Sequence, residues 1–183
     1  RRRSGGKFNN YALIAWQCRV IDQAQNKEIH KKFKKSLLTK GWFRNLVKLS
    51  LEDDGIIKAI KYLFESGIRL IIEPHLPQTH LDGAVFMLKN GPVIGLTLRY
   101  DRLDNFWFVL IHELVHIKRH LKKDDIESIF DDLEVYGDDL EKETAVAASL
   151  YIHKMLKRKS IQFTEEVNHW RNIAWREQMS GNF

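Results

Sequence analysis

The alternation of apolar and polar positions predicts helices in the first third of the chain. Residues Asn10–Ala24 carry apolar side chains at helical spacing, which predicts an amphipathic helix. Phe33–Val47 is basic with apolar residues interspersed, so we expect one or two short helices there. A further helix is expected to begin after Ser50, a candidate N-cap, and to run to about Glu65, where Gly67 ends it.

The hydrophobic period then changes to one typical of strands. Ile68–Glu73 is rich in β-branched residues and predicts a first strand, followed by Ala84–Leu88 and Val93–Leu98. Lys89–Pro92 between the last two has the composition of a hairpin turn. Three successive strands with a tight hairpin predict a small antiparallel or mixed sheet, and the chain as a whole an α+β fold.

The next helix is expected from about Asp104, as N-cap, to Leu121. The residues between Phe106 and Ile117 that flank its polar positions are apolar on all sides, so this helix is predicted to be buried. Polar side chains within such a helix need partners, because unpaired buried charge is costly.

The buried segment contains His112, Glu113 and His116 in an H-E-x-x-H arrangement. Histidines four residues apart lie on one helical face, so both imidazoles can reach one tetrahedral metal ion, usually zinc. Glu113 then lies beside the metal, where it can take a proton from a metal-bound water. The alternative is a buried histidine pair satisfied by hydrogen bonds alone; the apolar surroundings favour the metal.

A catalytic zinc site takes three protein ligands, so a third is expected on the helix after the motif. Glu141 is favoured because small residues continue its helical face, but spacing alone does not separate it from Glu143, and either could be an exposed surface charge. His120 cannot join two other histidines in line on one ion, and is interpreted as lying beside the site or at the surface. The remaining candidates for the third ligand are Glu134, Asp138, Asp139 and His153.

These motifs resemble those of the ImmA/IrrE-type zinc metallopeptidases. In that family H-E-x-x-H is followed on a later helix by E-x-x-A-N/D-x-F-A, here matched by Glu141–Ala148. Segments 77–84, 92–108 and 130–133 resemble a subgroup that is often fused behind a helix-turn-helix domain, in regulators similar to HigA antitoxins. The similarity covers roughly Ala15–Ile152. The chain departs from the family pattern at Thr144, Ala145 and Ala147, and none of these removes a ligand.

The resemblance implies a zincin-like fold, with helices gathered around the H-E-x-x-H helix and a three-stranded sheet. It implies Zn²⁺ held by His112, His116 and Glu141, and Glu113 as the catalytic base. The expected organisation is a basic N-terminal helical segment (1–49) that packs on or leads into the domain, a metallopeptidase core (50–160) and a C-terminal helix (161–183). The implied substrate is a helix-turn-helix repressor, as in toxin–antitoxin or related transcription regulation, and homodimerisation is compatible with the family.

Other functions stay open at this point. The domain could be a zinc-binding sensor or dimerisation module of a transcription factor or antitoxin, with little proteolysis. Glu113 speaks against this, because zinc binding alone does not need it, whereas the basic start of the chain speaks for it. A zinc hydrolase with a non-peptide substrate also remains open, and a second oxyanion donor is not fixed. The candidates for that donor are Tyr100, Tyr136, Tyr151, His80 and His153.

The net charge of +6 is uneven along the 183 residues. Arg1–Arg3 and Lys27–Lys40 are basic, whereas Asp124–Glu143 is acidic. Such a basic stretch can signal nucleic-acid contact. No aromatic–basic platform accompanies it, so a solvated face is the favoured interpretation, and DNA contact is expected only through a domain upstream of Arg1.

The single cysteine, Cys18, excludes a disulfide framework within the chain and fits a reducing cytoplasm. Because Cys18 lies in an apolar segment, we expect it to be a small core residue. No run approaches the ~18 apolar residues of a membrane span, so the expected location is the cytoplasm.

Overall fold

The computed structural model describes residues 9–98 and 102–119. In chain order these residues form α1 (Asn10–Gln25), η1 (Lys35–Leu37), α2 (Lys40–Lys48), η2 (Leu49–Leu51), α3 (Gly55–Glu65), β1 (Arg69–Ile72), β2 (Gly83–Leu88), β3 (Gly91–Leu96) and α4 (Leu103–Arg119), where η marks a short 3₁₀ helix. The predicted α+β class is confirmed. The expected C-terminal helix and Glu141 lie outside the described residues.

The three strands form one mixed sheet in the order β1-β3-β2. β3 pairs in antiparallel fashion with β2 through the predicted hairpin and in parallel fashion with β1, where Arg69 lies opposite Val93. The third strand ends at Leu96, two residues before the predicted end, and Leu98 adopts a left-handed backbone with φ of 47°. The chain therefore turns away from the sheet just before α4.

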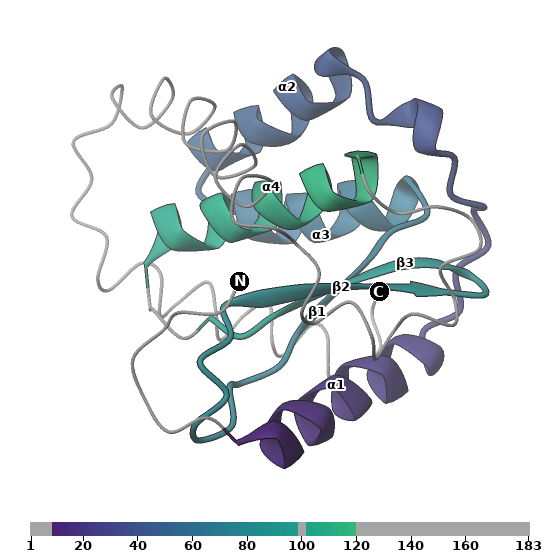
Figure 1. Ribbon diagram of the computed structural model, residues 1–183. Helices are drawn as coiled ribbons and strands as arrows, with labels where there is room; N and C mark the ends of the chain where they lie inside the picture. Colours follow the sequence, from purple (N-terminus) through teal and green to yellow (C-terminus); the bar gives the residue numbers. More distant parts are fainter. Residues whose placement is uncertain (1–8, 99–101, 120–183) are drawn as a thin grey trace.

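Helices cover both faces of the sheet. Figure 1 shows α1 beneath it and α3 and α4 above it, with α2 beyond them. Side chains alternate accordingly: Leu70 and Ile94 join the core under α3 and α4, whereas Ile71 and Val93 pack with Trp16 of α1. Because both faces are covered, β1 and β3 are apolar at nearly every position.

The predicted burial of the motif helix is confirmed. In α4 the side chains from Val109 to Ile117 are buried. The helix begins at Leu103, so Asp104 lies in its first turn and is not its N-cap. The Asp104 carboxylate instead accepts hydrogen bonds from the guanidinium of Arg102. None of the helices within residues 9–98 and 102–119 is long and apolar enough to cross a membrane.

Two further predictions about single residues are wrong. Ser50 does not cap a helix, because its buried hydroxyl donates to the carbonyl of Val47 (2.7 Å) and α3 begins only at Gly55. Cys18 is exposed and does not belong to the core. The inward face of α1 is occupied instead by Leu13, Trp16, Gln17, Val20 and Ala24.

Candidate metal centre

The two motif histidines converge in the middle of α4. His112 and His116 lie one turn apart, and their Nε2 atoms are 2.9 Å from each other. Their rings meet edge to face, with centroids 4.6 Å apart. Both residues are buried, with exposed fractions of 1% and 6%. Two imidazole nitrogens therefore point toward one place within a largely apolar environment.

This separation is close to what a metal ion requires. Two nitrogens that each lie ~2.0–2.1 Å from a tetrahedral zinc are about 3.3 Å apart. A small rotation of either ring would widen the 2.9 Å separation of His112 Nε2 and His116 Nε2 to that value. Imidazole nitrogen is a donor that suits zinc. The pair therefore fits two of the ligands of a zinc site.

No third side chain that could hold a metal joins the two histidines within the described residues. Within residues 9–98 and 102–119, no group of three His, Cys, Asp or Glu side chains is placed to hold one ion. Glu141 and Glu143, the two leading candidates from the sequence, both lie outside those ranges. The structure thus places two of the three predicted ligands together.

Glu113 lies between α4 and the start of β2, and its exposed fraction is 3%. A Cβ atom added to Gly83 would lie only 3.1 Å from Glu113 Oε1 and 2.7 Å from the Cγ1 of Val109. Residue 83 must therefore be small for β2 to approach this face of α4. The carboxylate predicted to be the base is enclosed by the helix and the edge of the sheet.

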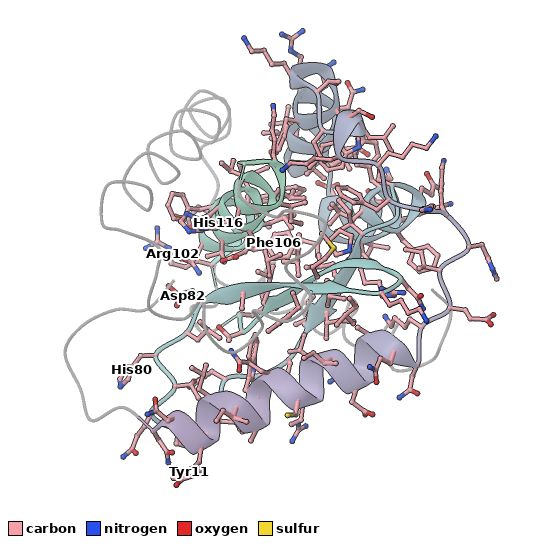
Figure 2. All side chains as sticks on the ribbon, turned by 45° about the vertical axis from the view of Figure 1, so that its right-hand side comes forward. Tyr11, His80, Asp82, Arg102, Phe106 and His116 are labelled. Atoms are coloured by element: carbon pink, nitrogen blue, oxygen red, sulfur yellow. The ribbon has the colours of Figure 1, made fainter. Side chains whose placement is uncertain are left out.

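The loop leading to Gly83 is tied to the end of β3 by Thr97. The Thr97 hydroxyl shares its one proton between the carbonyls of Leu81 (2.9 Å) and Asp82 (3.1 Å), and the Thr97 backbone N–H donates to the Asp82 carbonyl (3.0 Å). Figure 2 shows Asp82 and Arg102 on the side of the molecule where His116 lies. These bonds fix the position of Gly83, and through it the space left for Glu113.

The apolar flank of the histidine pair comes from the same helix. Phe108 lies one turn before His112, with the two ring centroids 6.2 Å apart. Of the candidates for a second oxyanion donor, only His80 is among the described residues, and Figure 2 shows it well away from His116. His80 is therefore not brought to the site.

Sequence reasoning found the three motif residues but not the residues that support them. Gly83 begins β2 and Thr97 directly follows β3, and both act across non-local contacts, so no local motif marks them. No protein-family model, curated protein or solved structure matches this chain. The resemblance to the ImmA/IrrE-type metallopeptidases therefore stays a prediction that rests on the sequence motifs.

Proposed function

We propose that this protein is a zinc-dependent metalloendopeptidase with a zincin-like fold. The observation that carries the proposal is the convergence of His112 and His116 on one place, with Glu113 enclosed beside them on the same buried helix. These two histidines would hold zinc, and the sequence resemblance supplies Glu141 as the third ligand. When bound, zinc supplies Lewis-acid activation of water.

The residues of the chain then move the proton. Glu113 accepts a proton from the attacking water on a carboxylate oxygen and passes it to the nitrogen of the leaving amine. The Glu113 side chain is buried between α4 and the start of β2, which restricts the movement of the proposed base. Such restriction would lower the entropic part of the barrier to proton transfer.

The proposed substrate is a helix-turn-helix repressor or a related regulator. This part of the proposal comes from the sequence resemblance, in which such peptidase domains accompany DNA-binding regulators. The first candidate substrates are therefore the repressors encoded next to the reading frame of this protein.

A zinc-binding regulatory module is the second candidate function. The observation that favours it is the burial of both histidines, whose exposed fractions are 1% and 6%. A metal held there would stabilise the fold whether or not it activated water, because metal binding and folding are coupled.

The deciding experiment separates metal binding from catalysis. Wild type, Glu113→Gln, His112→Ala and Glu141→Ala are each purified for zinc analysis and co-expressed with a neighbouring helix-turn-helix repressor. We expect one zinc per chain in wild type and Glu113→Gln, loss of zinc in the two alanine variants, and cleavage only by wild type. Removing a general base typically costs 10²–10⁴-fold in rate.

Each alternative outcome has a meaning. Unchanged zinc content in His112→Ala and Glu141→Ala would overturn the metal site. Full zinc content together with equally intact repressors in wild type and Glu113→Gln would favour the regulatory module.

A further inference from the structure

One described segment carries a larger net positive charge than the chain as a whole. Residues 27–48 contain eight lysines and arginines and one glutamate, which gives +7, whereas the whole chain carries +6. Lys31, Lys32, Lys34 and Lys35 are all exposed. Figure 1 shows this segment running up the side of the molecule where the β2–β3 hairpin ends.

The backbone that carries these lysines packs closely against Gly67, just before β1, and against Gly91 at the start of β3. Gly67 has a φ of 82°, and a Cβ atom on it would lie 2.7 Å from Phe33 N and 2.8 Å from Lys31 O. Phe33 packs its side chain on the core, while the lysines on either side remain exposed. Gly91 of the hairpin lies against Gly67 and Phe33, and Lys89 of the same hairpin is exposed. We call Lys31, Lys32, Lys34, Lys35 and Lys89 the basic surface.

A buried arginine next to this segment has no counter-charge among the described residues. Arg69, at the start of β1, is 2% exposed, and its Nε donates to the carbonyl of Lys27 (3.2 Å). Its Nη1 atom is buried without a hydrogen-bond partner, and no carboxylate in residues 9–98 and 102–119 pairs with it. Burial lowers the pKa of Arg69 and of Lys27.

An unneutralised charge at low dielectric raises the positive potential of the surface in front of it. A buried cation that no carboxylate of the described residues neutralises is also costly to keep, so its presence needs a reason beyond the stability of the fold. An anion bound on the basic surface would supply the missing negative charge.

The surface suits a phosphate backbone better than an acidic protein. Protein interfaces are usually centred on buried apolar or aromatic anchors. In the described segment 27–48, Leu37 is the only large apolar side chain that is exposed. A nucleic-acid backbone needs no such anchor, because phosphate contacts and counterion release supply its affinity.

We propose that the basic surface, with Arg69 behind it, binds the phosphate backbone of a nucleic acid without reading its sequence. Binding of this kind is independent of the peptidase activity proposed for α4. It also differs from the expectation that DNA contact would come only from a domain upstream of Arg1.

The first test uses a fluorescent DNA duplex of arbitrary sequence and the intact protein. Lys31→Gln/Lys32→Gln is compared with Lys58→Gln/Lys61→Gln, which removes the same charge from α3, where Lys58 already pairs with Asp54 (2.9 Å). In fluorescence anisotropy at about 0.1 M salt, we expect the first variant to bind about tenfold or more weakly, and its log–log salt slope to flatten by about 1.8. Equal weakening by both pairs would overturn the proposal, because only net charge would then matter.

The second test addresses Arg69 and the nature of the anion. Arg69→Met removes a buried charge, so we expect thermal stability to hold or rise while duplex affinity falls severalfold. If Arg69→Met binds the duplex as tightly as wild type, Arg69 does not contribute to nucleic-acid binding. If polyglutamate displaces the duplex as well as single-stranded DNA of equal charge, the partner is an acidic protein and the nucleic-acid assignment is wrong. If inorganic phosphate raises the melting temperature more than chloride of equal ionic strength while the duplex does not bind, the surface takes a small phosphate compound instead.

Discussion

At the scale of single residues, Gly83 is the position on which the enclosure of Glu113 depends. Its missing side chain leaves the space in which the start of β2 meets Val109 and Glu113 of α4. The methyl group of an alanine would come within 2.7 Å of Val109 Cγ1 and 3.1 Å of Glu113 Oε1. Real side chains do not tolerate such a contact, so either the strand or the helix side chains must shift.

We predict that Gly83→Ala destabilises the protein by about 1–3 kcal/mol, the usual cost of overpacking a core. Gly41→Ala is a matched control, because a Cβ atom there would meet only Thr39 Oγ1 at 3.7 Å near the start of α2. Gly41→Ala should raise the free energy of unfolding by about 0.4–1 kcal/mol, because alanine lowers the conformational entropy of the unfolded chain. Urea unfolding of both variants measures the difference. Equal stability of the two would show that β2 does not press on α4 as described.

The same residues show what a sequence can reveal of such a site. His112, Glu113 and His116 were found because helical spacing is local and the chemistry of the motif is specific. Gly83 was not found, because a glycine before a strand looks like any turn residue until its contact with α4 is known. Cys18 was misplaced for a related reason: its neighbours are apolar, but Trp16 and Val20 take the inward face of α1.

At the scale of elements, α1 is attached to the sheet through Glu73, which follows β1. Trp16 Nε1 donates to the Glu73 carbonyl (3.0 Å), and the carboxylate accepts from Arg19 Nε and Gln23 Nε2, both at 2.6 Å. The three donors are spaced along one side of α1. Since Glu73 is 3% exposed, one buried carboxylate fixes how the helix lies on the strand.

We predict that Glu73→Ala lowers the free energy of unfolding by roughly 1–3 kcal/mol. The reason is that the carboxylate loses its hydrogen bonds from Arg19 and Gln23. Arg19 is 62% exposed and can turn to water, which keeps the loss within that range. Glu65→Ala, which removes an exposed carboxylate at the end of α3, should stay within about 0.5 kcal/mol of wild type. Chemical unfolding measures both variants; a loss in Glu65→Ala as large as that in Glu73→Ala would contradict this role.

The sequence predicts which segments are helices and which are strands better than it predicts where they end and how the strands pair. The hairpin of β2 and β3 follows from the local composition of Lys89–Pro92, whereas the parallel pairing of β1 with β3 depends on contacts that no local pattern specifies. Ser50 and Asp104 both looked like N-caps. Each makes another bond in the structure, Ser50 to Val47 and Asp104 to Arg102, so the helices begin elsewhere.

At the scale of the whole molecule, α4 joins the candidate site to the main core. The apolar residues of α4 belong to the same cluster as those of α2, α3, β1 and β3. His112 and His116 lie within this helix, so a ligand that binds them also holds one face of the core together. Metal occupancy should therefore be visible in global stability and not only in activity.

We predict that removing zinc lowers the melting temperature of the protein by roughly 5–10 °C. At a free zinc concentration 100 times the dissociation constant, binding adds about 2.7 kcal/mol, and a domain of this size shifts by about 2–4 °C per kcal/mol. Thermal unfolding is followed for zinc-loaded protein before and after dialysis against a chelator.

Glu113→Gln should respond as wild type does, since Glu113 is not a proposed ligand. His80→Ala serves as a histidine control and should also respond, because His80 lies away from the pair. His112→Ala should show no shift on chelation. If wild type and His112→Ala shift equally, zinc stabilises the protein from another place, and the convergence of the two Nε2 atoms is a hydrogen bond within the core.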